Sequence, residues 1–208
     1  MRRYVLAFLA FIIFAATAAY ATTATGDPPK ATSVVKVVLE KGHGSGVHIG
    51  NGYILTAAHV VEARTTAKIK LSDGKEITGD VLWVNKAYDV ALLRTEGGAM
   101  GLSKLACRTI AVGDVIRAAG NPTILEFVDS YGKVSGAKRE LRPWKAVVIT
   151  DITTVPGMSG GPVFDENGEV VGISVGVLSL PMGFTASLTG FGTMVPSSTI
   201  CELLARSS

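Results

Sequence analysis

Asp151-Ile-Thr-Thr-Val-Pro-Gly-Met-Ser-Gly-Gly-Pro162 is the stretch that decides the fold, because it sets a serine between glycines just ahead of an apolar strand. Gly157, Gly160 and Gly161 have no Cβ, so their backbone can adopt positive φ and let a substrate carbonyl approach closely. Ser159 would lie at the point of this turn, and the N–H groups of Gly157 and Ser159 could form an oxyanion hole. A Gly-rich surface turn with an ordinary serine also fits these residues. A serine hydrolase therefore needs a base and an acid elsewhere in the chain.

A candidate base lies in the segment Gly52-Tyr-Ile-Leu-Thr-Ala-Ala-His-Val-Val61, where an apolar strand runs into small residues and then His59. A serine hydroxyl is a poor nucleophile at neutral pH and needs a neighbouring base such as imidazole. The two other histidines are expected to be structural or solvent-facing, since His43 lies in a Gly-rich turn and His48 on a strand. A hydrogen-bonded packing histidine is the alternative interpretation of His59.

Asp89 is the candidate acid, because it stands immediately before the apolar run Val90-Ala-Leu-Leu93. A carboxylate at the mouth of a buried strand needs strong hydrogen-bond donors to offset its desolvation. An imidazole N–H is such a donor, and in serine proteases the aspartate fixes the tautomer of the histidine. A strand-capping aspartate is the alternative.

Four motifs of the chain, in this order, resemble the trypsin-like (chymotrypsin-fold) serine proteases, and especially the bacterial HtrA-type branch. The motifs are Gly44-Ser-Gly46, Leu55-Thr-Ala-Ala-His-Val-Val61, Asp89-Val-Ala-Leu-Leu93 and Gly157-Met-Ser-Gly-Gly-Pro-Val163. The order His, Asp, Ser distinguishes this family from subtilisin-like and α/β-hydrolase enzymes. The resemblance implies a serine endopeptidase that works through an acyl-enzyme with the triad His59, Asp89 and Ser159 and needs no cofactor. A catalytically silent binding or chaperone-like module, and a processing protease with a single substrate, remain alternatives.

The resemblance also places the primary substrate pocket at the residues before the nucleophile and on a late strand. The residues concerned are Thr153, Thr154, Gly192, Thr193 and Met194. None is a carboxylate, so a buried cationic side chain would lack a counter-charge. We therefore expect cleavage after small or medium apolar residues.

The chain departs from the family at two points. Met158 stands where zymogen-type relatives have an aspartate that pairs with a new N-terminus, so activation by N-terminal cleavage is not expected. The chain ends at Ser208, and we expect it to lack the peptide-binding PDZ domain that HtrA-type enzymes append. The oligomeric state cannot be carried over from that branch.

The N-terminus has the pattern of a secretory signal peptide over residues 1–21. Arg2 and Arg3 precede the apolar run 5–16, and Ala19-Tyr-Ala21 fits a cleavage site. Residues 22–31 are rich in Thr, Pro and small residues and are expected to form a flexible leader to a protease domain at 32–208. We therefore expect an exported protein, periplasmic or secreted, with no membrane span after signal cleavage, although a retained signal anchor is the alternative.

Charge, cysteine content and ligand spacing limit the partners. Removal of Arg2 and Arg3 leaves 18 basic and 17 acidic residues, which gives no electrostatic reason to expect nucleic acid as a partner. Protein or peptide substrates are the expected partners. Cys107 and Cys201 form either one disulfide or two buried thiols, and the sequence leaves both open. The usual metal-ligand spacings are missing, so no metal site is expected.

Short β-branched runs punctuated by turns predict an all-β fold. Six runs precede residue 95 and six follow residue 114, which predicts two packed six-stranded antiparallel β-barrels. His59 and Asp89 belong to the first barrel and Ser159 to the second, so the site would form where the barrels meet. Thr199-Ile-Cys-Glu202 resembles a capping box and predicts a short C-terminal helix. Residues 178–189 are expected to form a long exposed loop.

Overall fold

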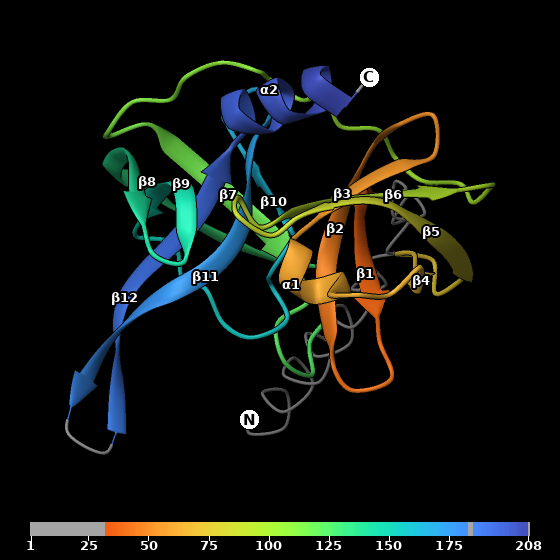
Figure 1. Ribbon diagram of the computed structural model, residues 1–208, viewed down its shortest axis with the longest axis horizontal. Helices are drawn as coiled ribbons and strands as arrows, with labels where there is room; N and C mark the ends of the chain where they lie inside the picture. Colours follow the sequence, from red (N-terminus) through yellow and green to blue (C-terminus); the bar gives the residue numbers. More distant parts are fainter. Residues whose placement is uncertain (1–31, 183–184, 208) are drawn as a thin grey trace, which may run out of the picture. The chain divides into compact units, whose positions relative to one another are not determined.

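The computed structural model describes residues 32–182 and 185–207, and these form two antiparallel β-barrels of six strands each (Figure 1). The first barrel closes in the order β1-β2-β3-β6-β5-β4, and the second in the order β10-β11-β12-β9-β8-β7. The first contains β1 Val34–Val38, β2 His43–Gly50, β3 Tyr53–Thr56, β4 Thr66–Lys70, β5 Glu76–Asn85 and β6 Val90–Thr95. The second contains β7 Val115–Gly120, β8 Val128–Leu141, β9 Trp144–Thr150, β10 Pro162–Phe164, β11 Val170–Met182 and β12 Thr185–Pro196. The all-β prediction of two six-stranded barrels is confirmed.

Two glycine-containing turns join consecutive strands. Asp73-Gly74 connects β4 to β5, and Asn167-Gly168 connects β10 to β11. Gly74 has φ +87° and Gly168 has φ +75°, a backbone region that glycine enters without a steric penalty. Both turns therefore follow from local chemistry alone.

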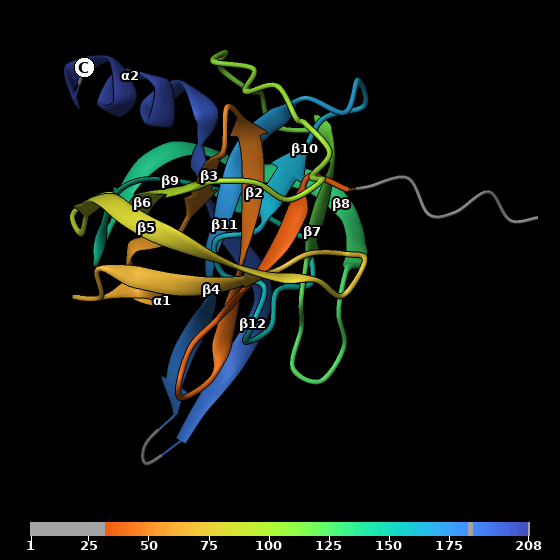
Figure 2. The ribbon, with the colours of Figure 1, turned by 90° about the vertical axis from the view of Figure 1, so that its right-hand side faces the viewer.

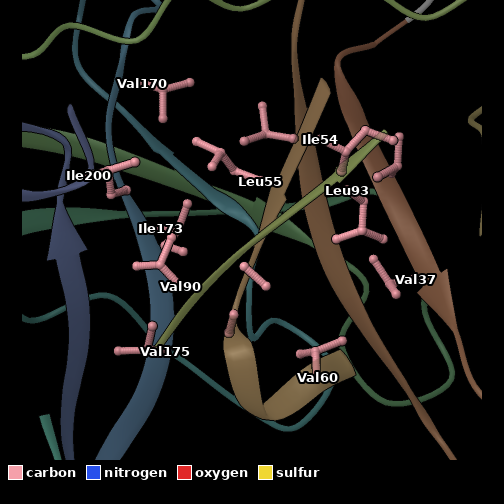
Figure 3. Close-up of a cluster of buried hydrophobic side chains, with 14 of the residues drawn as sticks. Val37, Ile54, Leu55, Val60, Val90, Leu93, Val170, Ile173, Val175 and Ile200 are labelled. Carbon is pink, nitrogen blue, oxygen red and sulfur yellow. The ribbon is translucent and has the colours of Figure 1, made fainter. Parts of the chain in front are cut away.

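An apolar cluster continues from the inside of the first barrel into the contact with the second (Figure 3). Leu55 and Leu93 of the first barrel share this cluster with Val170 and Ile173 of the second, and all four are fully buried. A smaller cluster around Ile152 fills the second barrel. Each Å² of apolar surface removed from water contributes about 25 cal/mol to the free energy of folding. The apolar contact between the barrels therefore stabilises them as the core of a single domain does.

Two helices accompany the barrels. The short helix α1 Ala58–Val61 follows β3, and α2 Ser197–Ser207 follows β12 directly. The expected C-terminal helix is present, but it begins two residues before Thr199, so Thr199 lies in the first turn and is not its cap. Ile200 and Leu203 of this helix are buried against the core. A disulfide joins Cys201 of this helix to Cys107 in the segment between the barrels, with 5.7 Å between the Cα atoms.

The expectation of a loop at residues 178–189 is wrong. Strands β11 and β12 continue through this segment as a two-stranded ribbon that extends from the second barrel in both views (Figures 1 and 2). Ser179 pairs with Leu188 and Leu180 with Ser187. The Gly and Pro residues suggested a break, but backbone pairing between β11 and β12 continues as far as Met182 and Thr185.

The expected signal peptide and leader lie outside the described residues. Within residues 32–182 and 185–207, no helix has the length and apolar character needed to cross a membrane. The same residues contain no group of three or more His, Cys, Asp or Glu side chains placed to hold a metal ion.

Candidate active site

His59 and Asp89 are brought together by the pairing of two strands of the first barrel. His59 lies in α1, just after β3, and Asp89 stands directly before β6. Because Thr56 of β3 pairs with Ala91 of β6, the end of one strand meets the start of the other. His59 Nδ1 and Asp89 Oδ2 are 2.7 Å apart, and the His59 backbone N–H donates to Asp89 Oδ1 at 2.9 Å. The carboxylate thus fixes both the backbone and the ring of the histidine.

Asp89 is held in an unusual position by three donors. Its backbone has φ +57°, in the left-handed region that few residues other than glycine adopt. The indole Nε1–H of Trp144, from β9 of the second barrel, donates to Asp89 Oδ2 at 3.0 Å. Burial raises the pKa of Asp89. The opposing contributions are larger and hold the pKa of Asp89 below its usual value: the hydrogen bond from the His59 side chain, the charge of that imidazole, and the N–H groups of the His59 backbone and Trp144. The group is therefore a carboxylate at neutral pH.

Ser159 lies in a turn that is pressed against the first barrel. The carbonyl of Ser159 accepts the N–H of Ser45 in β2 at 2.8 Å. Gly160 has φ +84°, and a Cβ there would lie 2.2 Å from Thr56 Oγ1 and 2.7 Å from the N of Ala57. The turn therefore contacts the chain immediately before His59, and only glycine fits at position 160. No hydrogen bond joins Ser159 to His59 among the described residues, and such bonds are often long in substrate-free enzymes.

Two backbone N–H groups of this turn are directed away from their neighbours. A trans peptide points its C=O and N–H in opposite directions. Pro156 O accepts the N–H of Thr123 at 2.9 Å, so the N–H of Gly157 points the other way. Met158 O accepts the N–H of Gly161 at 3.0 Å, which likewise turns the N–H of Ser159 outward. Neither N–H donates to another group in the described part of the chain, so both are available to a ligand oxygen.

A network of buried hydrogen bonds supports the Gly157–Ser159 turn on the side that faces the protein interior. Ser45 Oγ donates to Gly157 O at 2.7 Å and accepts the N–H of Asn121 at 2.9 Å. Asn121 is fully buried, and its carbonyl lies 2.7 Å from His43 Nε2. Gly157 has φ +96°, and a Cβ there would lie 2.2 Å from Asn121 O. His43 thus supports the turn, while His48 bonds Gly101 O at 2.8 Å elsewhere in the first barrel, and both have structural contacts as expected.

A surface depression of about 470 Å³ opens beside His59. Its lining is mainly apolar, and the described residues around it are Ala58, His59, Glu62, Lys86, Asp89, Pro143, Trp144 and Val175. Both barrels contribute to this wall. The imidazole is therefore reachable by a ligand that lies across the barrel contact.

Residues 44–173 match the family model of the trypsin-like peptidase domain, which spans all three of His59, Asp89 and Ser159. This chain belongs to the trypsin-like peptidase family. The match covers more than half of the chain and agrees with the two-barrel fold.

Curated relatives of this trypsin-like chain are named as proteases. A probable periplasmic serine endoprotease DegP-like from Pseudomonas savastanoi pv. phaseolicola is 34% identical over 145 residues, covering 68% of this chain and 30% of the relative. Protease Do-like 1, chloroplastic, from Arabidopsis thaliana is 32% identical over 175 residues, covering 78% of this chain and 39% of the relative. The chain thus spans less than two thirds of the length of these relatives.

Solved structures of HtrA-type proteases share the fold. HtrA-type protease AlgW with tripeptide superimposes with a TM-score of 0.73 at 25% identity, over 85% of this chain and 60% of that one. The serine endoprotease from Yersinia pestis gives a TM-score of 0.71 at 26% identity, over 85% and 63% of the two chains.

The residues expected to form the substrate pocket divide between the two faces of β12. Gly192 lies beside Thr154, whose Oγ1 would be 2.6 Å from a Cβ at Gly192. Met194 shares the strand face of Gly192 and is fully buried, while Thr193 faces the other way, against Gly176 of β11. Thr153 is exposed. The structure thus brings Thr154 and Gly192 together, while Met194 lies in the apolar cluster of the second barrel.

Three residues with direct contacts to the site were missed by sequence reasoning. Ser45 and Asn121 support the Gly157 turn, and Trp144 donates to Asp89. In the sequence, Ser45 is only the middle residue of a glycine motif, and Asn121 before Pro122 resembles an ordinary turn residue. Trp144 belongs to the second barrel, and no spacing in the sequence connects it with Asp89.

Proposed function

We propose that this chain is a serine endopeptidase in which Ser159 is the nucleophile, His59 the general base and Asp89 the orienting acid. The hydrogen bond between His59 Nδ1 and Asp89 Oδ2 is the observation that carries the proposal. Because Nδ1–H donates to a carboxylate, the lone pair of the imidazole is left on Nε2, the nitrogen that can take a proton from a hydroxyl.

The reaction proceeds in two acyl-transfer steps. Ser159 Oγ attacks the substrate carbonyl carbon, its proton passes to His59 Nε2, and the N–H groups of Gly157 and Ser159 stabilise the oxyanion. His59 then returns the proton to the leaving amine, and the acyl group stays on Ser159. Water, deprotonated by the same nitrogen, releases the acid and restores the serine. Asp89 stabilises the imidazolium throughout and remains ionised.

Peptides are the proposed substrates. The relatives are named endoproteases, and AlgW has been solved with a tripeptide. None of Thr154, Gly192 and Met194, around which the pocket is proposed, carries a charge, which favours a small or medium apolar residue before the cleaved bond. Thr153 and Thr193 would flank this pocket.

Export to the periplasm or beyond the cell is proposed with this function. The N-terminal 21 residues have the signal pattern, and DegP-like relatives are named periplasmic. A disulfide between Cys107 and Cys201 also suits an oxidising compartment.

Cleavage of a peptide library by the wild-type protein and by Ser159→Ala tests this function. We expect cleavage at many sequences with small or apolar residues before the scissile bond, and no cleavage by the variant at equal folded concentration. Cleavage that persists in Ser159→Ala would refute the nucleophile. The absence of any cleavage by folded wild-type protein would instead favour a non-catalytic binding module.

A further inference from the structure

Trp144 reaches the candidate active site from the opposite barrel. It opens β9 next to the turn that follows β8, whereas Asp89 belongs to the first barrel. Its indole Nε1–H donates to Asp89 Oδ2 at 3.0 Å, the same oxygen that lies 2.7 Å from His59 Nδ1. The carboxylate therefore receives donors from both barrels.

The position of the indole is fixed by its backbone and by its ring. The N–H of Lys145 donates to the carbonyl of Ala87 at 2.9 Å, which ties the start of β9 to the segment just before Asp89. A Cβ at Gly176 would lie 2.9 Å from Trp144 Cη2 and 3.0 Å from Cζ2. The ring thus lies over a strand residue that has no side chain, with its N–H edge toward Asp89.

An indole suits this place because its N–H is a donor that neither accepts nor titrates. It stabilises the charged form of the carboxyl group without supplying a proton that could pass to it. Two donors on Oδ2 and one on Oδ1 leave the carboxylate little freedom to rotate about its Cβ–Cγ bond. The alignment of His59 with the Ser159 turn depends on that orientation.

We propose that Trp144 is a positioning residue for the catalytic pair, acting through the hydrogen bond from its indole N–H to Asp89 and so linking the geometry of the two barrels. This inference rests on the proposed peptidase function for its kinetic consequence. Its structural consequence, at the bond between His59 and Asp89, is independent of that function.

The decisive variant replaces Trp144 by 3-benzothienylalanine, because sulfur takes the place of the indole N–H with little change in ring shape. The amino acid is inserted by stop-codon suppression at position 144. Trp144→Phe is a genetic counterpart that also removes the donor. Trp83→Phe, in β5, is the matched control, since Trp83 is the other tryptophan of the chain. Hydrolysis of a small ester that leaves the depression empty separates positioning from substrate binding.

We expect the benzothienyl protein to lose about tenfold in kcat for the ester, the order of one hydrogen bond to a charged group, with KM nearly unchanged. Trp144→Phe should lose at least as much, and Trp83→Phe should match the wild type. A benzothienyl protein with wild-type kcat would overturn the proposal and leave Trp144 as a wall of the depression only. A rise in KM at constant kcat would do the same.

Proton NMR of the His59 Nδ1–H, in the Ser159→Ala background where no turnover occurs, supplies a readout that does not need activity. Loss of the Trp144 donor should shift this low-field resonance, because Asp89 Oδ2 then has one donor fewer. An unchanged resonance would reject the positioning role. A shifted resonance, together with a folded protein that retains Ser159 and hydrolyses neither ester nor peptide, would uphold that role and reject the peptidase function instead.

Discussion

At the scale of single residues, some features of Asp89 can be predicted from the sequence and others are seen only in the structure. Its place before an apolar strand is visible in the sequence, and the expectation that it would accept a hydrogen bond from His59 agrees with the geometry. Its left-handed backbone and its indole donor are not visible, because both depend on chain segments far from position 89. The carboxylate is satisfied only once the second barrel is in place.

Asp89→Asn should reduce kcat by about 10⁴, the cost of the same change in serine proteases, since an amide can hold the imidazole in the wrong tautomer. The melting temperature should also fall, because the amide NH2 group replaces an oxygen that accepts an N–H from His59 or Trp144. Peptide-hydrolysis kinetics, with Asp80→Asn on the exposed surface as control, provide the measurement. Retention of a tenth or more of wild-type kcat would mean that Asp89 does not orient the base.

At the scale of elements, the segment 121–127 between β7 and β8 connects the first barrel to the Ser159 turn. Asn121 donates from its side chain to Val35 O and accepts the N–H of Phe127, each at 3.1 Å. Glu126 bonds Lys36 and Lys70 on the first barrel, each at 2.8 Å. Through Thr123 and Pro156 this segment sets which way the Gly157 N–H points.

Asn121→Ala should therefore lower both stability and activity. Loss of the side chain leaves buried partners unsatisfied, which costs about 1–3 kcal/mol. The Gly157 turn loses its support, so kcat should fall more than KM changes. Urea unfolding and peptide hydrolysis measure the two effects, with Asn167→Ala in an exposed turn as the control. Wild-type kcat in a destabilised Asn121→Ala protein would show that the network serves folding alone.

The disulfide fixes another element, the C-terminal helix α2, to the segment between the barrels. Its cysteines are 94 residues apart in sequence, so a bridge removes much freedom from the unfolded chain. Chain entropy for a loop of that length predicts a loss of up to about 4–5 kcal/mol in the double variant Cys107→Ala/Cys201→Ala.

Urea denaturation under oxidising conditions measures this loss, and wild-type protein treated with reductant is the comparison. Within residues 32–182 and 185–207, neither cysteine forms a hydrogen bond with His59, Asp89 or Ser159, so activity at 25 °C should persist. Equal stability of the double variant and the oxidised wild type would show that the bridge does not constrain the unfolded state.

At the scale of the whole molecule, the barrels could be predicted from the sequence because strand pattern and turn residues act locally. Six strands lie within residues 34–95 and six within residues 115–196, in agreement with the two predicted groups of runs. The β11–β12 ribbon and the start of α2 differ, since long-range pairing and packing extend elements past local turn signals. The histidine, acid and serine could be proposed from motifs, whereas Trp144 and Asn121 required the barrels to be placed side by side.

Acid sensitivity is a property of the whole molecule that the carboxylates determine. Asp165 accepts Arg108 at 2.8 Å and the N–H groups of Asn167 and Glu169. Burial raises the pKa of Asp165, but the Arg108 hydrogen bond and the backbone donors outweigh it and hold the pKa below the usual value. A depressed folded pKa gives stability that is present above about pH 4, the unfolded value, and is lost as pH falls through the folded pKa.

Asp165→Asn should thus be less stable than the wild type at pH 6, by about 1 kcal/mol because Arg108 is partly exposed. The amide keeps an acceptor for the turn, so the difference isolates the charge. Urea unfolding between about pH 2 and pH 6 should show the two proteins converging below about pH 4. A difference that stays constant down to about pH 2 would assign the effect to packing.

Intact-mass analysis after reaction with a fluorophosphonate tests most directly whether Ser159, His59 and Asp89 act together. We expect one covalent adduct, mapped by peptide digestion to Ser159, absent from Ser159→Ala and formed far more slowly by His59→Ala. Trypsin under the same conditions verifies the reagent. No adduct on folded wild-type protein, or an adduct on a residue other than Ser159, would contradict the assignment of this chain as a serine peptidase with that triad.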